Sequence, residues 1–403
     1  MYTKPAIMIT TILVILFWLG LFLVFYTYLG YGILLFFLVK IKNLISGKAK
    51  KVELIDYPDV TLVMTAYNEE SVVKIKMDNC HALKYPKGKL TICWITDGSD
   101  DRTNELLAGY PEVSVLFQPL RQGKTSALNR GISYIKTPVT IFTDANTMLN
   151  ENAIIEIAKC FADPKVGCVA GEKRIKQKET GDATAGEGIY WKYESVLKTL
   201  DDQLYSAVGA AGELFAIRTE LFEVMPADTL LDDFILSMRI AQKGYKIAYC
   251  KEAFAVEEPS SDILEEQKRK VRISAGGLQS IYRLKSLLNP FKYGILSFQY
   301  VSHRVLRWSI TPFVLFLLLP LNLLLVTIVE RGLVLYLVLL ALQVMFYLTG
   351  FLGNMYAKKQ IKKKVFYIPF YFLFMNISVI KGIRYLRRKK GSGIWEKAKR
   401  AGN

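Results

Sequence analysis

Hydrophobic residues are concentrated at the two ends of this 403-residue chain, whereas the middle is polar and mixed. No charged residue occurs in residues 5–39. A helix that crosses a bilayer needs about 20 residues, so this run is too long for one straight span and barely long enough for two. We expect one transmembrane helix that continues into an interfacial stretch at residues 26–39. A tight hairpin through Gly20 or residues 30–32 is the alternative.

A second apolar region begins at residue 310. Residues 310–329 and 333–356 are each of spanning length, and a short turn, Glu330-Arg331-Gly332, joins them. We therefore expect a transmembrane hairpin at 310–356, preceded by an interfacial amphipathic segment at 286–309. The next apolar stretch, residues 365–380, is only roughly 24 Å long as a helix and contains Pro369. Basic clusters on both sides favour a re-entrant or interfacial helix there, with a third crossing as the alternative.

Between residues 51 and 285, short β-branched runs alternate with helical patterns. The alternation predicts an α/β fold, in which a mostly parallel sheet has helices on both faces. Ligands bind such sheets at the carboxyl ends of the strands, so the residues after each strand are the candidates for chemistry. We predict strands at residues 60–65, 90–96, 113–118, 139–143 and 166–170, with helices at 69–83, 101–108, 125–135 and 152–161.

Polar residues follow each of the first four predicted strands. Asp and Asn are also good helix caps and turn residues, but four such groups at successive strand ends indicate a shared ligand site. The four groups are Ala66-Tyr67-Asn68-Glu69-Glu70, Asp97-Gly98-Ser99-Asp100-Asp101, Arg121-Gln122-Gly123-Lys124 and Asp144-Ala145-Asn146.

These residue types suit a nucleotide diphosphate, which needs a divalent cation, oxygen ligands for that cation and basic groups. Asp144 and Asn146 can both reach one Mg²⁺ or Mn²⁺ or its water shell. Asp97 can accept hydrogen bonds from a base or ribose, and Lys124 can bring positive charge to the ligand. The chain has no Walker A motif, which argues against a P-loop ATPase, and no GxGxxG opens a helix.

The succession of motifs resembles the processive membrane-bound family 2 glycosyltransferases, which include cellulose, chitin, hyaluronan and poly-N-acetylglucosamine synthases. The resemblance covers nearly the whole chain, and the motifs occur in the right order. The matching stretches are Ala66-Tyr67-Asn68-Glu69-Glu70, Thr96-Asp97-Gly98-Ser99, Gly123-Lys124, Thr143-Asp144-Ala145-Asn146, Gly209-Ala210-Ala211-Gly212 with Ala216-Ile217-Arg218, Leu231-Asp232-Asp233-Phe234, and Arg269-Lys270-Val271-Arg272-Ile273 with Ala275-Gly276-Gly277.

The resemblance implies a GT-A fold and an inverting, metal-dependent transfer from a nucleotide sugar, a UDP-sugar. By position, Asp97 resembles the acid that contacts the uridine and Asp144 the first acid of the metal-binding DxD. Asp233 resembles the general base, and Arg272 the arginine that holds the pyrophosphate. The expected donor site comprises Ala66, Tyr67, Glu69, Asp97, Lys124, Asp144, Arg269 and Arg272; Gly212 and Asp232 are expected at the acceptor, and Asp144 and Asn146 at the metal.

The chemistry of inversion agrees with the role of Asp233. A one-step displacement at the anomeric carbon needs one base for the acceptor hydroxyl and a cation for the leaving diphosphate. A carboxylate at the start of a helix that faces a pocket fits the base. The alternative is that Asp232 or Asp233 only caps the helix that follows.

Three departures from the family pattern bear on the acceptor and the metal. The DxD position ends in Asn146, and the acid pair reads Asp232-Asp233 instead of Glu-Asp. The Gln-x-x-Arg-Trp position lacks both its Gln and its Trp, which in the family helps to shape the acceptor site. Trp191 or Trp308 could stack on a sugar instead, although such aromatics are more often core residues or interface anchors.

Three functions follow from these observations. We expect a membrane-embedded enzyme that extends a β-linked polysaccharide and passes it through its own helices. The alternative is transfer of one sugar to a lipid-linked acceptor. The third possible function is that of a non-enzymatic scaffold. The presence of Asp97, Asp144 and Asp233 argues against it. The expected partners are the donor, a growing glycan or lipid-linked acceptor, and the bilayer, with no nucleic acid; a homo-oligomer or accessory subunit is left open.

Charge sharpens the topology. The net charge is +17, with 52% hydrophobic residues. Residues 40–51 and 357–403 carry five and thirteen net positive charges, so the rest of the chain is close to neutral. By the positive-inside rule, we expect a multi-pass protein of the plasma (inner) membrane whose enzyme domain is cytosolic.

The expected segments are an N-terminal helix and basic flank (1–50), a GT-A domain (51–285), an interfacial segment (286–309), a hairpin (310–356) and a basic C-terminal part (357–403). Within that last part, residues 395–400 resemble the cytoplasmic tail motif of hyaluronan synthases only faintly, and a basic amphipathic tail on anionic lipid is the alternative.

The remaining residue counts exclude other chemistry. The two histidines, His81 and His303, have no ligand pattern around them, which argues against a His-rich metal site or a Ser-His-Asp triad. The five cysteines show no CxxC spacing. We expect them to be small buried residues in a reducing compartment.

Overall fold

The computed structural model describes residues 4–47, 54, 56–176, 185–330, 332–359 and 364–388. Part of the basic residues expected to orient the chain, at positions 48–51, 362–363 and 389–390, and the tail motif at 395–400 lie outside these ranges.

The described part of the middle region forms an eight-stranded sheet in the order β3-β2-β1-β4-β7-β6-β8-β5. The first four strands in sequence are mutually parallel where they pair, and β7 inserts antiparallel between β4 and β6. The prediction of a mostly parallel sheet is therefore confirmed. The strands are β1 (Val60–Ala66), β2 (Leu90–Asp97), β3 (Val113–Gln118), β4 (Val139–Asp144), β5 (Thr147–Leu149), β6 (Val166–Ile175), β7 (Leu214–Arg218) and β8 (Lys246–Glu257).

Helices cover both faces of the sheet and bury two separate apolar cores. Successive strand residues point to opposite faces, so Val63 of β1 lies in one core and Leu62 and Met64 lie in the other. α3 (Glu70–His81), α4 (Thr103–Leu107) and α6 (Ala153–Cys160) pack on the Leu62 side, and α5 (Lys124–Gly131) and α8 (Asp232–Gln242) pack on the Val63 side. The predicted strands and helices up to residue 170 correspond to β1–β4, β6 and α3–α6.

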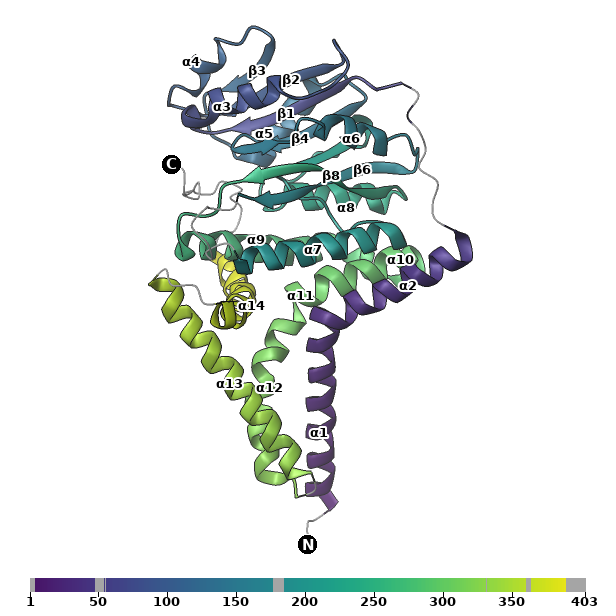
Figure 1. Cartoon of the computed structure of the whole chain (residues 1–403), viewed down its shortest axis with the longest axis vertical. Coiled ribbons are helices and arrows are strands. Elements are labelled where there is room, and N and C mark those ends of the chain that lie inside the picture. Colours follow the sequence, from purple (N-terminus) through teal and green to yellow (C-terminus); the bar gives the residue numbers. More distant parts are fainter. Residues whose placement is uncertain are drawn as a thin grey trace.

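A layer of helices separates the sheet from the apolar ends of the chain (Figure 1). It contains α7 (Ala185–Leu204), α9 (Ile263–Arg283), α2 (Tyr31–Ser46) and α10 (Pro290–Tyr300). Tyr31 and Leu35 of α2 pack with Leu197 of α7 in a small buried cluster. The short helical turns are η1 (Tyr26–Gly30), η2 (Ile132–Tyr134), η3 (Thr219–Leu221), η4 (Lys285–Leu288), η5 (Val301–Val305) and α11 (Leu306–Trp308).

Three apolar helices run away from this layer in Figure 1: α1 (Lys4–Phe25), α12 (Ile310–Ile328) and α13 (Leu333–Lys358). Phe17 of α1 packs with Leu318 and Leu325 of α12 and Tyr336 of α13, while many large hydrophobic side chains face outward. The N-terminal run is not one straight helix, because the chain changes direction at the π-helical turn η1 between α1 and α2.

The last helix, α14 (Lys364–Arg388), is longer than the apolar stretch at residues 365–380 suggests. The helix continues through Lys381 and Gly382. Gly382 packs directly on α9, since a Cβ atom there would lie 2.9 Å from the backbone nitrogen of Ala275. Four described segments, one of them α14, are long and apolar enough to cross a membrane. In Figure 1, α14 is seen nearly end-on beneath α9, across the direction of α1.

Candidate active site

A cavity of about 800 Å³ lies between the sheet and the apolar helices. Its sheet-side wall comes from the starts of α5 and α8, the end of β4, residues 210–213 and α9. Its opposite wall comes from α1, η1, α13 and α14. Of the expected site residues, the cavity brings together Lys124, Asp144, Gly212, Asp232, Asp233, Arg269 and Arg272.

Lys124 lies among three carboxylates on the sheet side of the cavity. Its Nζ donates a hydrogen bond to Oδ1 of Asp144 at 2.7 Å and lies 4.0 Å from Oδ2 of Asp232. Burial works against the charged ammonium, but the carboxylates of Asp144 and Asp232 raise the pKa of Lys124 overall. A Cβ atom added to Gly212 would lie 3.2 Å from this Nζ and 3.4 Å from Oδ2 of Asp233, so only glycine leaves this part of the cavity open.

Asp233 lies at the start of α8. The fold raises the pKa of its carboxyl group, which makes the carboxylate a stronger base. Burial and the neighbouring Asp232 carboxylate raise the pKa of Asp233 to about 7. Its Oδ1 accepts a hydrogen bond from its own helix, the backbone N–H of Phe234, at 2.8 Å. The N-cap residue of α8 is Leu231, and no side chain makes a capping hydrogen bond there. Asp233 therefore does not cap the helix, and its side chain lines the cavity.

Asp97 lies next to the cavity, outside its lining. Its carboxylate is nearly buried and accepts hydrogen bonds from the backbone N–H groups of Gln122 and Gly123, at 3.0 and 2.6 Å from Oδ2. Gly123 adopts a φ of 94°, which only glycine takes readily, and Lys124 follows it directly. In this structure Asp97 thus fixes the loop that places Lys124.

The other residues expected at the donor or metal also lie outside the cavity lining. Ala66 ends β1 beside Thr96, Tyr67 stacks under the Arg121 guanidinium at 3.6 Å, and the backbone N–H of Glu69 donates to Thr103. Asn146 is half-buried in the turn after β4 and does not line the cavity. The expected donor site is therefore divided between the ends of β1 and β2 and the cavity itself.

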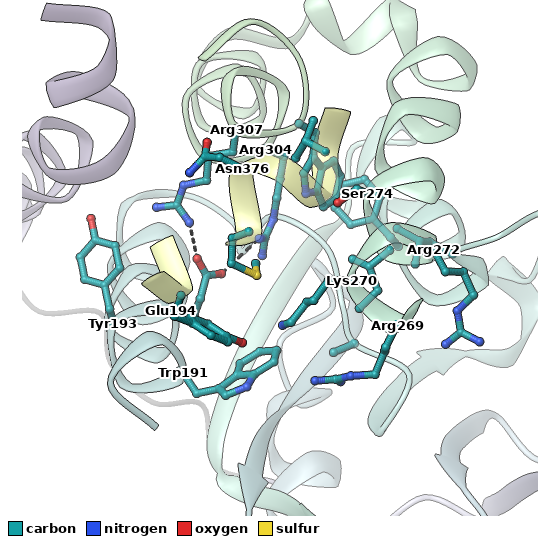
Figure 2. Close-up of a pocket in the computed structure, with 18 of the residues that line it drawn as sticks. Trp191, Tyr193, Glu194, Arg269, Lys270, Arg272, Ser274, Arg304, Arg307 and Asn376 are labelled. Atoms are coloured by element: carbon teal, nitrogen blue, oxygen red, sulfur yellow. Dashed lines mark hydrogen bonds and ion pairs between the residues drawn. The ribbon is translucent and has the colours of Figure 1, made fainter. Parts of the chain in front are cut away.

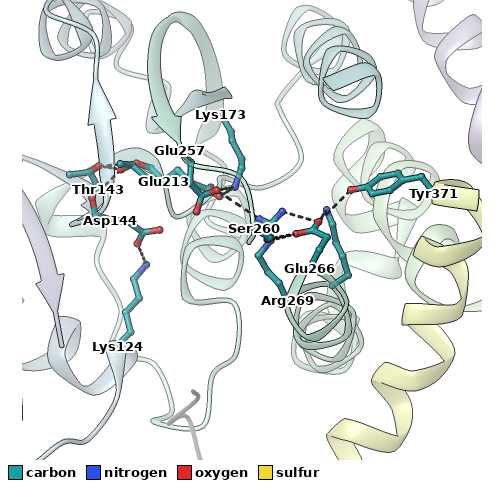
Figure 3. Close-up of polar contacts among 12 residues, drawn as sticks. Lys124, Thr143, Asp144, Lys173, Glu213, Glu257, Ser260, Glu266, Arg269 and Tyr371 are labelled. Atoms are coloured by element: carbon teal, nitrogen blue, oxygen red, sulfur yellow. Dashed lines mark hydrogen bonds and ion pairs between the residues drawn. The ribbon is translucent and has the colours of Figure 1, made fainter. Parts of the chain in front are cut away.

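The two α9 arginines expected at the donor, Arg269 and Arg272, differ in their surroundings. Arg269 is buried and donates two hydrogen bonds to Glu266, at 2.9 and 3.0 Å, and its guanidinium also lies 3.9 Å from Glu257 (Figure 3). Glu257 in turn contacts the buried Lys173, which also binds Glu213. Arg269 therefore belongs to an ion network that joins β6 and β8 to α9. Arg272, one turn further along, is half-buried and lines the cavity.

Comparison with known proteins places this site in a family. Residues 58–276, more than half of the chain, match the family model described as glycosyltransferase-like family 2. The chain is a member of glycosyltransferase family 2. The match ends within α9 and includes every residue expected at the donor, acceptor and metal.

The poly-β-1,6-N-acetyl-D-glucosamine synthases are curated relatives of this glycosyltransferase. The Staphylococcus aureus protein is 28% identical over 234 residues, which are 56% of each chain. The Staphylococcus epidermidis protein is 24% identical over 262 residues, 62% of each chain. The matched part thus spans a little over half the length of these relatives.

A solved structure confirms the fold. The mannosyltransferase PcManGT from Pyrobaculum calidifontis, solved in complex with GDP-Man and Mn²⁺, superposes with a TM-score of 0.68. The two share 20% sequence identity, and the superposition covers 93% of this chain and 99% of the other. The likeness therefore includes the apolar helices as well as the sheet, and the predicted α/β fold of the GT-A type is confirmed.

The donor set in the cavity fits a divalent cation, although the described residues contain no cluster of three or more His, Cys, Asp or Glu side chains that could hold a metal ion on their own. Mg²⁺ is usually held by one or two carboxylates together with substrate phosphates. Asp144 supplies one carboxylate. Oδ2 of Asp232 is buried and has no hydrogen-bond partner among the described residues, so it can supply a second.

Sequence reasoning missed a buried lysine beneath the Asp144 turn. Lys76 of α3 is fully buried, and its Nζ donates a hydrogen bond to the carbonyl oxygen of Thr147 at 2.5 Å. Burial lowers the pKa of Lys76 to about 8. A lysine in an amphipathic helix is ordinarily solvated, so the sequence contains no signal for this contact.

It also missed the charged residues deeper in the cavity. Glu194 of α7 is buried and binds Arg304 at 3.1 Å and Arg307, as Figure 2 shows. His303 is fully buried between Asp201, at 2.6 Å, and Glu194, at 3.4 Å. The sequence predicts Arg304 and Arg307 at a membrane interface, and only the packing of α7 against η5 and α11 shows that they line a cavity.

Proposed function

We propose that this protein is a membrane-embedded inverting glycosyltransferase that uses a nucleotide-diphospho-sugar, a UDP-sugar, to extend a β-linked polysaccharide. The observation that carries the proposal is the position of Asp233, a carboxyl group with a pKa raised to about 7, in the same cavity as Lys124 and Asp144. The likeness to the poly-N-acetylglucosamine synthases supports the polymer as product.

In the proposed reaction, an acceptor hydroxyl attacks the anomeric carbon of the donor sugar and gives its proton to the Asp233 carboxylate. The bond from that carbon to the diphosphate breaks as the new glycosidic bond forms, and the nucleoside diphosphate leaves. A single displacement of this kind inverts the configuration. In this proposal Lys124 and Arg272 would hold the departing diphosphate, and Asp97 would hold the loop that carries Lys124 or contact the base.

A divalent cation, Mg²⁺ or Mn²⁺, would be held by Asp144, with Oδ2 of Asp232, which makes no hydrogen bond among the described residues, as a second ligand. The cation supplies charge stabilisation for the leaving diphosphate. Asn146 would contribute through a bound water, because its side chain does not line the cavity.

The proposed topology places α1 and the α12–α13 hairpin across the plasma (inner) membrane and the sheet in the cytosol. The excess of lysine and arginine after α2 and after α13 supports this orientation. The direction of α14 in Figure 1 supports an interfacial position for that helix. Translocation of the product along the cavity would follow from this arrangement.

A second candidate, transfer of one sugar to a lipid-linked acceptor, is favoured by one observation. The wall of the cavity formed by α1, η1, α13 and α14 is mostly apolar, with Phe25, Phe346 and Phe372 among its residues. Ile273, at the position of the family's tryptophan, also lines the cavity. An apolar wall suits a hydrocarbon chain better than a sugar polymer.

A donor screen tests the proposal. The full chain in detergent is incubated with UDP-N-acetylglucosamine, UDP-glucose and GDP-mannose, with Mg²⁺ or Mn²⁺, and nucleoside diphosphate release is measured. We expect release from a UDP-sugar and none from the Asp233→Asn variant. Absence of release from every donor would overturn the proposal. Product sizing then separates the candidates, since a polymer ladder indicates extension and a single addition indicates the lipid-linked acceptor.

A further inference from the structure

We propose that the membrane-side half of the cavity binds the phosphate or diphosphate group of a lipid-linked acceptor saccharide, with Lys198, Arg304 and Arg307 around the anion. The proposal rests on the proposed function, in which a sugar hydroxyl is the nucleophile. It adds that the acceptor is an anionic amphiphile, whether it receives one sugar or several.

The first observation is an excess of positive charge in the middle of the cavity. Lys198 of α7, Arg304 of η5 and Arg307 of α11 all line it. Lys270 of α9 lines it too, but its ammonium lies 3.5 Å from the Glu266 carboxylate. Glu194 is the acidic residue that binds both arginines. Burial opposes the charged form of Glu194, yet the two guanidinium groups hold its pKa well below its ordinary value. Glu194 therefore remains a carboxylate and orients the two arginines without neutralising them both.

The second observation is Lys198 itself. The residue is only 5% exposed, and yet it lines the cavity. Within the described part of the chain its ammonium has no hydrogen bond or close ion pair with a carboxylate, and it lies 5.5 Å from the ring centre of Tyr249. Glu194, Glu213 and Asp233 attract it electrostatically, but a buried charge without a directly bonded partner is costly. A bound anion would supply the missing partner.

The third observation identifies the anion as part of a lipid. Phe25 of α1, Leu29 of η1 and Ile368 of α14 line the cavity and remain 49%, 57% and 48% exposed. The apolar wall of the cavity is therefore accessible and is not covered by packing. A hydrocarbon chain from the bilayer would bury this apolar surface, whereas a soluble glycan would gain little from contact with it.

The three observations fit one ligand. Its tail lies against the apolar wall, its phosphate lies at Lys198, and its terminal sugar extends towards Asp233. That sugar's hydroxyl oxygen forms a bond to the anomeric carbon of the donor while the bond from that carbon to the diphosphate breaks. The hydroxyl proton passes to Asp233, and the bonding electron pair leaves with the nucleoside diphosphate. Trp191 and Trp308 line the intervening part of the cavity and can contact this sugar.

The experiment compares binding of two amphiphiles to the full chain in lipid nanodiscs. One is polyprenyl diphosphate N-acetylglucosamine, and the other carries the same tail and sugar without the diphosphate. We expect the anionic compound to bind at least tenfold more tightly. Lys198→Met should weaken its binding by about ten- to a hundredfold, the range for a charge-assisted contact, and leave binding of the neutral compound unchanged.

Lys192→Met is the matched control, because Lys192 is exposed on the same helix and does not line the cavity; it should change neither affinity. Lys198→Met removes a buried ammonium without a carboxylate partner, so its melting temperature should equal or exceed that of the parent. A lower melting temperature with an unchanged preference for the anionic compound would show that Lys198 is structural and would overturn the proposal.

Two further outcomes separate this proposal from the proposed function. If inorganic pyrophosphate binds as tightly as the anionic lipid, the apolar wall contributes nothing, the site takes a soluble diphosphate, and the inference is wrong. If a UDP-sugar is turned over but the two amphiphiles bind equally, the inference fails while the proposed function stands. Selective binding of the anionic lipid without nucleotide release from any donor would support this site and overturn the transferase.

Discussion

The raised pKa of Asp233 makes the candidate base testable through stability as well as activity. The fold raises this pKa from the ordinary 3.8 to about 7 because the carboxyl group is buried beside Asp232. A shift of that size corresponds to about 4 kcal/mol, at 1.36 kcal/mol for each pH unit. The folded protein therefore carries a cost whenever Asp233 is ionised.

The sign follows from proton linkage. Between pH 3.8 and about 7 the folded state holds a proton on Asp233 that the unfolded state has released, so the contribution of this group to stability falls as the pH rises. The cost is absent below pH 3.8 and complete above about 7. Asn has the shape of the protonated acid and cannot ionise, so Asp233→Asn should stabilise the protein by up to about 4 kcal/mol at pH 8 and by much less at pH 5.

Activity should move in the opposite direction. A base must be deprotonated, so kcat/KM of the parent should fall about tenfold for each pH unit below 7 and level off above it. Asp233→Asn should lower kcat by about a hundred- to ten-thousandfold, the range for loss of a general base. Asp59→Asn, at an exposed carboxylate, is the control and should change neither property.

The assay combines thermal melting in detergent at pH 5 and pH 8 with nucleoside diphosphate release across the same range. The reasoning would be refuted by an Asp233→Asn variant that melts lower than the parent at pH 8. It would equally be refuted by a variant that keeps more than a tenth of the activity or the same pH profile, since Asp233 would then not be the titrating base.

Three further predictions concern neighbouring residues. Lys76→Met leaves the Thr147 carbonyl without its donor and should lower stability by about 1–3 kcal/mol, with a larger loss of turnover than of donor affinity; melting curves and kcat against KM check this. Gly212→Ala places a methyl group 3.2 Å from Nζ of Lys124 and should lower kcat about tenfold while changing stability by less than about 1 kcal/mol; an unchanged kcat would contradict the site geometry. Chelation by EDTA should abolish nucleotide release, Mn²⁺ or Mg²⁺ should restore it, and Asp144→Asn should raise the cation concentration for half-maximal activity at least tenfold; activity in EDTA equal to that with metal would exclude the proposed cation.

Much of the sheet could be predicted from the sequence because its first half is built from local β-α units. The strands and helices from β1 to α6 alternate in sequence and pair with near neighbours, so their period is visible in short windows. β7 could not be predicted in the same way. It is a five-residue, mostly buried run that pairs with β4 and β6, and no local pattern distinguishes such a run from a helix segment.

The candidate site was predictable to a similar extent. The strand-end rule and the family resemblance together predict that Lys124, Asp144 and Asp233 lie close together although they are far apart in sequence. In the structure all three line the same cavity. What the sequence could not show is how charges are compensated. Arg269 is held by Glu266, and Asp97 is occupied by backbone N–H groups. These partners are fixed by packing between elements, which residue type alone does not reveal.

The charge distribution connects the site to the bilayer. The excess of positive charge along the sequence lies in two flanks, while the rest of the chain is nearly neutral overall. Within that nearly neutral part, however, the described structure places Lys198 of α7, Arg304 of η5 and Arg307 of α11 around one stretch of the cavity. A buried positive region next to apolar helices is costly unless an anion regularly occupies it. A neutral glycan would leave that cost in place throughout the reaction, whereas an anionic lipid would remove it when the acceptor binds. Ile273 replaces the family's tryptophan, and this replacement is consistent with an anionic lipid acceptor. An acceptor that is held by its phosphate and its tail needs less stacking on its sugar.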